Sequence, residues 1–273
     1  MMDPSVSRQD SDHRDYRRYD ASGLQHVEQG SSELIPAATV IVLRDAPDGI
    51  ETLMLHKNSK IAFGGMWVFP GGRIDAADTV VGGDGKPDDL ATAAVAAVRE
   101  AAEEASVAVD PDGMVWFARW VPPPVMPKRF ATFFFAARLE ADAGSIAIDD
   151  GEITDHEWMR PADAMSRRDG GEIELAPPTW MTLNRLAGYA DVSAALADLE
   201  STDPTFYETH MARTENGPVA MWEGDGGYGS NDPTRPGPRH RLTMVEDHYF
   251  FEDDRACGNN PTYPRPVAPT RST

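Results

Sequence analysis

Two features limit most strongly the fold and the site that this chain can form. They are a glycine turn and an acidic helix, which are well separated in the sequence. The turn follows the apolar, β-prone residues 67–69, which Pro70 and the pair Gly71-Gly72 end abruptly. Paired glycines let backbone carbonyls and amides approach a ligand, because no Cβ obstructs them. Such a turn is also common without any function, so its meaning depends on what the fold brings near it.

The acidic helix is predicted over residues 90–107, which are rich in Ala and Glu and contain no Gly or Pro. Asp88 or Asp89 is expected to cap its start. The helical period places an apolar arc on one side and the glutamates on roughly the opposite side. The residues of this apolar arc are Ala94, Val98, Ala101 and Ala105.

Glu100, Glu103 and Glu104 are surface neighbours on this helix, because their spacing is i, i+3 and i+4. Their charges repel one another, and a hard cation that prefers oxygen ligands, Mg²⁺ or Mn²⁺, would relieve the repulsion. The alternative is a solvated acidic face, which is the usual explanation of a charge run.

Together the turn and the helix resemble the Nudix box. Gly72 matches its first glycine, Asp78 stands where the pattern has Glu, and residues 99–104, Arg-Glu-Ala-Ala-Glu-Glu, match the helical part. Ser106 replaces the glycine at the helix end. Residues 79–91 interrupt the box, and their Gly, Asp and Pro content predicts a loop that leaves the helix register intact.

The interruption is similar to that of Nudix proteins in the branch of the peroxisomal coenzyme A diphosphatase. The resemblance covers residues 38–199 and implies an α+β fold, an α/β/α sandwich with a mixed central sheet. Extra C-terminal helices and a hairpin are expected beside it. The further segments that resemble this branch are 56–60, 120–122, 128–135 and 177–180.

The resemblance implies the roles of the box residues. The metal would be held by Gly72, through its carbonyl, and by Glu100, Glu103 and Glu104, while Arg99 would pair with Asp78 as structural support. Asp in place of Glu shortens that pair by one methylene. The general base is open between Glu100, Glu152 and Glu157, and the expected catalytic residues are Glu100, Glu103, Glu104 and Glu152.

Lys128 and Arg129 are expected to neutralise substrate phosphates. Trp120 and Phe130 would stack on an adenine, or else pack in the core as strand aromatics usually do. The expected function is metal-dependent hydrolysis of a nucleoside diphosphate-linked substrate, with coenzyme A or acyl-coenzyme A preferred. The alternatives are a diphosphatase for ADP-ribose, NADH or a dinucleotide, and a non-catalytic Nudix-fold binding module.

Net charge and composition limit the classes of partner that the chain is expected to bind. A formal charge of −20 over 273 residues disfavours nucleic acid or an anionic membrane as the main partner. Cys257 is the single cysteine, so no disulfide forms within one chain. There is no apolar run that could span a membrane, and the N-terminus is polar, so a cytoplasmic protein is expected. The expected partner is a small-molecule nucleotide, and a homodimer is left open.

The expected organisation is a disordered arm at 1–30, a Nudix domain at 31–200, an extension packing on it at 201–255 and a disordered tail at 256–273. The role of the extension is open. Segments 219–222 and 241–245 are expected to pair as strands. The other expected strands are 37–43, 51–55, 114–121, 130–139 and 153–159, and the other expected helices start at 161, 179 and 192.

Overall fold

The computed structural model describes residues 33–58, 63–126, 128–139, 146–148, 151–245 and 248–255. The expected arm at 1–30, the expected tail at 256–273 and Cys257 lie outside these residues. No helix in the described ranges combines the length and the apolar character needed to cross a membrane.

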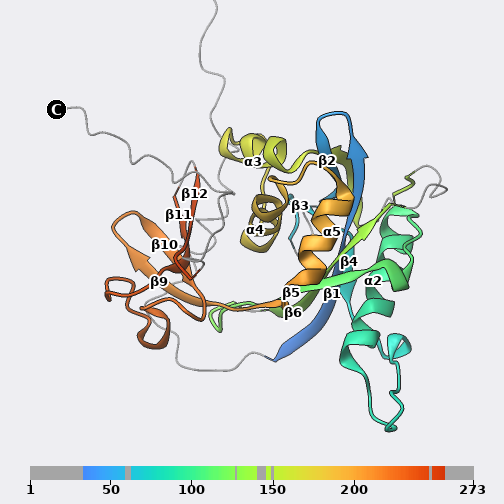
Figure 1. The fold of residues 1–273 in the computed structure, drawn as a ribbon, viewed down its shortest axis with the longest axis horizontal. Coiled ribbons are helices and arrows are strands. Elements are labelled where there is room, and N and C mark those ends of the chain that lie inside the picture. Colours follow the sequence, from blue (N-terminus) through green and yellow to red (C-terminus); the bar gives the residue numbers. More distant parts are fainter. Residues whose placement is uncertain are drawn as a thin grey trace, which may run out of the picture.

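The centre of the fold is a mixed sheet with the strand order β3-β2-β1-β6-β5-β8, which confirms the expected mixed sheet (Figure 1). β1 runs parallel to β6 and antiparallel to β2, and β4 and β7 pair with β1 and β2 from outside this order. The strands are β1 (Leu34–Ala46), β2 (Gly49–Lys57), β3 (Trp67–Val68), β4 (Gly71–Arg73), β5 (Val115–Val121), β6 (Arg129–Arg138), β7 (Ile153–Met159) and β8 (Thr205–Glu208).

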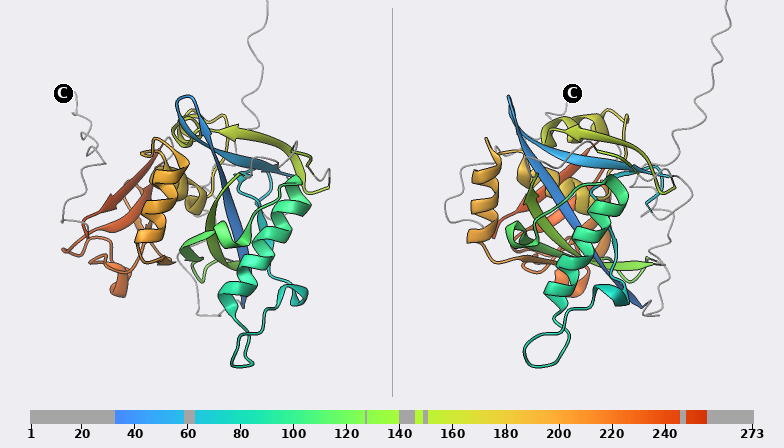
Figure 2. Two further views of the ribbon diagram at one scale, coloured as in Figure 1. Left: turned by 45° about the vertical axis from the view of Figure 1, so that its right-hand side comes forward. Right: turned by 90° about the vertical axis from the view of Figure 1, so that its right-hand side faces the viewer.

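Helix α2 (Asp89–Ala105) covers one face of this sheet, where it packs against alternate residues of β1, β2 and β6 (Figure 2). The Asp88 side chain caps its start by accepting a hydrogen bond from the Ala91 backbone, as expected. The helix ends at Ser106 in a left-handed conformation with φ of 55°, which most often requires glycine. Ser106 therefore adopts at the helix end the backbone conformation for which glycine is the usual residue.

The buried face of α2 differs from the apolar arc predicted from helical periodicity. Ala101 and Ala105 are buried as expected, but Ala94 and Val98 are only partly buried, and the buried face instead includes Glu104. The other buried members of this face are Thr92, Ala93, Ala96 and Ala97. A glutamate can face the sheet here because a lysine of β2 lies opposite it, and periodicity alone does not reveal that partner.

The other face of the sheet is covered by α3 (Pro161–Asp169), α4 (Pro177–Leu186) and α5 (Val192–Ser201). Buried side chains of these helices form one core with the inward residues of β1, β5 and β6. The sandwich of helices on both faces is therefore confirmed. Proline opens α3 and α4, where its missing N–H costs nothing and its fixed φ suits the first turn.

The chain after α5 continues the first sheet and then builds a second one. β8 adds to the sheet edge parallel to β5, and Thr209 leads into an antiparallel sheet ordered β12-β11-β10-β9. Segments 219–222 and 241–245 pair as expected, with Val219 opposite Thr243. Whether a domain boundary falls at residue 200 stays a prediction. The strands of the second sheet are β9 (His210–Thr214), β10 (Gly217–Met221), β11 (His240–Met244) and β12 (Tyr249–Asp253).

Candidate active site

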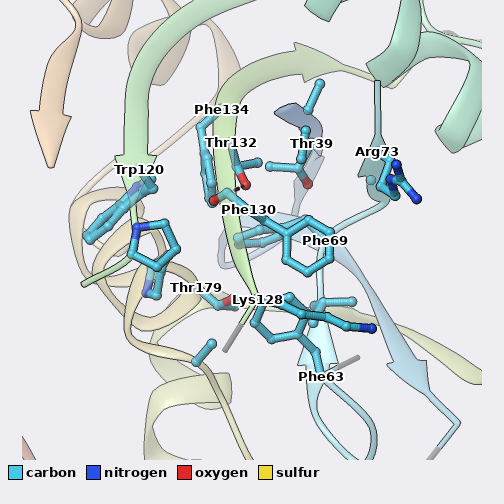
Figure 3. Close-up of a pocket in the computed structure, with 18 of the residues that line it drawn as sticks. Thr39, Phe63, Phe69, Arg73, Trp120, Lys128, Phe130, Thr132, Phe134 and Thr179 are labelled. Carbon is cyan, nitrogen blue, oxygen red and sulfur yellow. Dashed lines mark hydrogen bonds between the residues drawn. The ribbon is translucent and has the colours of Figure 1, made fainter. Parts of the chain in front are cut away.

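One cavity of about 620 Å³ is lined by residues of the glycine turn, the acidic helix and the second sheet. Figure 3 shows part of this lining, including Thr39 and Phe130. The lining includes residues of β1, β4, β5 and β6, the C-terminal part of α2, the start of α4 and residues of the second sheet. Residues more than a hundred positions apart in the sequence therefore face the same space.

Close backbone approach explains why Gly71 and Gly72 are both glycines. They pair with Thr39 and Ala38 of β1, and a Cβ on Gly71 would collide with Thr39. A Cβ on Gly72 would overlap the carboxylate of Glu100. The Gly71 N–H donates to Oε2 of Glu104 at 2.9 Å. The turn therefore lies directly against two of the helix acids, as a shared site requires.

Glu104 is the most enclosed of the three helix glutamates, at 5% exposure. Its Oε1 accepts from Nζ of Lys57 at 2.6 Å, and the same Nζ lies 3.6 Å from Oε2 of Glu152. Burial raises the pKa of Glu104 above its ordinary value, although the charge of Lys57 and the Gly71 N–H oppose this rise. Lys57 therefore compensates the charge of an acid that would otherwise be costly to bury.

Arg99 forms hydrogen bonds with three other acids of the site, Asp78, Glu100 and Glu103. Its Nε and Nη2 each donate to one Asp78 oxygen at 2.9 Å, while Nη1 donates to Glu100 at 3.0 Å and to Glu103 at 2.8 Å. These bonds from Arg99 hold the pKa of Asp78 below its usual range. Nη2 also donates to the Arg73 carbonyl at 3.0 Å. The shorter Asp78 side chain thus still forms the expected pair, and the pair fastens α2 to the turn.

Glu100 and Glu103 accept from the same nitrogen, so their carboxylates lie close to each other, and that of Glu100 lies against Gly72. Burial raises the pKa of Glu100, against the opposing effect of Arg99. In the described ranges no three acidic, His or Cys side chains are arranged as a metal-binding cluster; Arg99 is paired with Glu100, and Lys57 with Glu104. The donor chemistry still fits a hard cation, because carboxylate oxygens predominate and the Glu100 carboxylate lies directly against the backbone of Gly72.

The expected candidates for the general base separate in space. Glu152 lines the cavity with 60% of its side chain exposed, beside Lys57. Glu157 does not line it, and both its oxygens accept from Nη1 of Arg167 at 2.9 Å. Glu100 lies at the turn, as described above. The arrangement thus favours Glu152 or Glu100 over Glu157.

The expected substrate-binding residues also fall into two groups. Lys128 is exposed on the cavity lining, and Phe130 lies 6.1 Å from Phe63 between ring centroids. Arg129 does not line the cavity, because its buried side chain donates to the Pro122 carbonyl at 3.0 Å. The structure therefore gives Arg129 a role in holding the loop that precedes β6, contrary to the expected phosphate contact.

Trp120 lines the cavity but is only 4% exposed. Its ring stacks on Tyr207 of β8 at 3.9 Å and 8°. One face of the indole is therefore already covered by an aromatic neighbour, so the alternative of core packing describes this side chain better than stacking on adenine.

Sequence reasoning missed several lining residues. Lys57 was predicted only as part of the matching segment 56–60, although a lysine just after the strand predicted over 51–55 is itself unusual. Phe63, Thr39 and the residues of the second sheet gave no local signal. They come to the cavity from the loop before β3, from β1 and from the second sheet, which are far apart in the sequence.

Comparisons with known proteins find a matching family model and similar solved structures. Residues 34–179 match the family model described as NUDIX domain. A crystal structure of a NUDIX hydrolase from Alicyclobacillus acidocaldarius is similar at 25% identity and a TM-score of 0.53, over 61% of this chain and 96% of that one. The NUDIX domain of Shewanella oneidensis NrtR, solved with ADP ribose, matches at 15% identity and a TM-score of 0.42, over 62% of this chain and 94% of that one.

Proposed function

Since the chain belongs to the Nudix family, we propose that Glu100, Glu103, Glu104 and the carbonyl of Gly72 hold the divalent cation with which it cleaves a nucleoside diphosphate derivative. The chain is a hydrolase that acts on pyrophosphate bonds. One observation carries the assignment of residues: the glycine turn and the acids of α2 contact each other on the wall of one cavity.

A bound Mg²⁺ or Mn²⁺ would neutralise the phosphate oxygens and lower the pKa of a coordinated water. The chain's own groups do the positioning. Arg99 fastens α2 to the turn through Asp78, so the carboxylates and the Gly72 backbone keep their separation. Lys57 offsets the charge of Glu104, and Lys128 supplies a cation at the exposed lining for a substrate phosphate.

Glu152 is our proposed general base. Its carboxylate lies on the cavity lining close to Lys57, exposed enough to meet water, whereas Glu157 is held by Arg167 elsewhere. In the reaction, water forms a new P–O bond, the bridging P–O bond breaks, and the water proton passes to Glu152 and then to the departing phosphate. Two phosphomonoesters result, so atoms and charge balance.

Coenzyme A is the substrate we propose first, because the interrupted box and its flanking segments resemble that branch. The cavity is large enough for a nucleotide conjugate, since small-molecule sites usually enclose about 300–1,000 Å³. ADP-ribose, NADH or a dinucleotide is the second candidate class, which shares the same diphosphate.

Incubation of the purified chain with Mg²⁺ or Mn²⁺ and a substrate panel tests the function. The panel contains coenzyme A, ADP-ribose, NADH and a diadenosine polyphosphate, and the products are separated by chromatography. We expect 3′-phosphorylated AMP from coenzyme A as the dominant product, and none when EDTA is present. Turnover of ADP-ribose alone would move the assignment to the second class, and no turnover at all would contradict catalysis.

A further inference from the structure

The far wall of the catalytic cavity comes from the second sheet, and its chemistry differs from that of the acidic end. Ala220 and Trp222 lie on the same side of the chain at the end of β10, since side chains alternate along a strand. Met211 stands directly opposite Ala220 across the β9–β10 pair, and Met244 belongs to β11. All four line the cavity, together with Phe134 from the first sheet.

This wall offers almost no polar group to a ligand. Thr209 is the polar residue that the extension contributes to the lining, and its hydroxyl accepts from Nε1 of Trp222 at 3.1 Å. The Thr209 hydroxyl and the Trp222 indole N–H therefore already form a hydrogen bond with each other. A sugar or an amide placed here would leave its own donors and acceptors without partners, and that is costly in an enclosed site. An apolar group has no such penalty.

The wall is also firmly attached to the catalytic domain. Trp222 meets Trp120 edge to face at 5.6 Å and Tyr207 at 5.1 Å, while Trp120 stacks on Tyr207. Trp222 is fully buried. Three aromatic rings thus join the two sheets beside the cavity, so the wall keeps its position relative to the acids.

From these contacts we propose that the sheet of β9–β12 forms an apolar subsite of the catalytic cavity, which binds a flexible hydrocarbon arm on the substrate diphosphate. The substrate class is a nucleoside diphosphate that carries a fatty chain. This inference rests on the proposed function and adds its specificity. Phe130, Thr132 and Phe134 alternate along β6, and all three line the cavity over roughly 14 Å of strand.

Two chemical sources could supply such a chain: an acyl thioester of coenzyme A, or a nucleoside diphosphate esterified to an acylglycerol. Both are used as probes. The first series is coenzyme A and its acetyl, butyryl, hexanoyl and octanoyl thioesters, and the second is CDP-dihexanoylglycerol and CDP-dioctanoylglycerol. We expect kcat/KM to rise along at least one series, by up to about fourfold per added methylene until the subsite is filled.

The variant Ala220→Phe fills the subsite. It should reduce kcat/KM for the octanoyl probe at least tenfold more than for coenzyme A itself, so that the dependence on chain length disappears. Met211→Gln places an amide in the same subsite from the neighbouring strand, and should have the same effect if Ala220→Phe fails to fold. Glu252→Ala, on the exposed side of β12, is the control and should keep the wild-type dependence.

The outcomes separate the two proposals. Hydrolysis of coenzyme A with the same kcat/KM for every chain length, in the wild type and in both variants, would overturn the apolar subsite and leave the proposed function standing. Hydrolysis of neither series nor of any polar nucleotide would refute the proposed function itself. A chain-length dependence that survives in both variants would place the arm elsewhere in the cavity and also contradict the subsite.

Discussion

Lys57 and Glu104 form an ion pair of 2.6 Å between Nζ and Oε1 in which both side chains are nearly inaccessible to solvent. One partner ends a strand of the central sheet and the other belongs to the acidic helix, so the pair crosses the interface on which the site is built. Lys57 therefore offsets the buried charge of Glu104, whose other oxygen accepts from the Gly71 N–H. The consequences of removing that cation can be measured.

We predict that Lys57→Met lowers the free energy of unfolding by about 3 kcal/mol, because it leaves the Glu104 charge buried without its partner. A divalent cation would supply the missing charge, so Mg²⁺ should stabilise this variant more than the wild type. Urea unfolding with and without Mg²⁺ measures both effects. Lys86→Met, at an exposed lysine in the interrupting loop, is the control and should change stability by less than about 0.5 kcal/mol. Equal stability of Lys57→Met and the wild type would contradict the role of the pair.

Gly72→Ala should reduce hydrolysis at least a hundredfold, since the new methyl group would occupy the space of the Glu100 carboxylate. Gly83→Ala is a matched control, because nothing lies within 4 Å of a Cβ at that position. Steady-state kinetics on the best substrate of the panel compares the two, with circular dichroism to check the fold. Normal activity of Gly72→Ala would exclude the close approach described for the turn.

The Arg99–Asp78 pair should behave as a coupled unit. Arg99→Lys removes the fork that grips both Asp78 oxygens, and Asp78→Asn removes its charge. We expect each change to cost about 2–3 kcal/mol, and the double variant to cost clearly less than their sum. A double-mutant cycle from denaturant unfolding gives the coupling energy. Strict additivity of the two changes would show that the pair does not fasten the helix to the turn.

Much of the fold could be predicted from the sequence, because the residues of each helix or strand indicate that element by themselves. The cap at Asp88, the Ala-rich helix after it and the apolar strands each predict their own element, and each element is present. The turn and the helix acids were predicted to meet because the resemblance to the Nudix box joins them. Once β4 pairs with β1, Gly72 lies against Glu100.

The features that could not be predicted depend on contacts between residues that are far apart in the sequence. Glu104 faces the sheet beside Lys57 of β2, and helical periodicity does not reveal a partner on another element. The burial of Arg129 depends on the Pro122 carbonyl of the preceding loop. The second sheet reaches the cavity because Tyr207 and Trp222 pack on Trp120, and nothing in residues 205–255 alone predicts that contact.

His240 should make stability depend on pH. The side chain is fully buried, and burial lowers its pKa below the ordinary value, against the effect of its bond with the Glu223 carbonyl. The unfolded chain therefore binds a proton at this residue first, as pH falls below about 6.5. The unfolded state then holds more protons than the folded state, so stability decreases toward low pH.

Between pH 7.5 and 5.5 this residue should remove about 1 kcal/mol of stability. The charges nearest it, Asp225, Asp253 and Arg255, are present in both the wild type and the variant His240→Leu. The difference between their pH slopes isolates the histidine, whatever the absolute stability of the variant. Parallel slopes in urea unfolding across this range would show that His240 does not titrate differently on folding.

The most direct measurement is Mn²⁺ binding by electron paramagnetic resonance, in the wild type and in Glu103→Gln. Glu103 is exposed enough for the amide to leave the fold intact, and Glu157→Gln, at an acid held by Arg167 outside the cavity, is the control. We predict that Glu103→Gln weakens Mn²⁺ binding at least tenfold and abolishes hydrolysis, while Glu157→Gln matches the wild type in both. Unchanged Mn²⁺ affinity together with full activity in Glu103→Gln would contradict the proposal that the acids of α2 hold the metal beside Gly72.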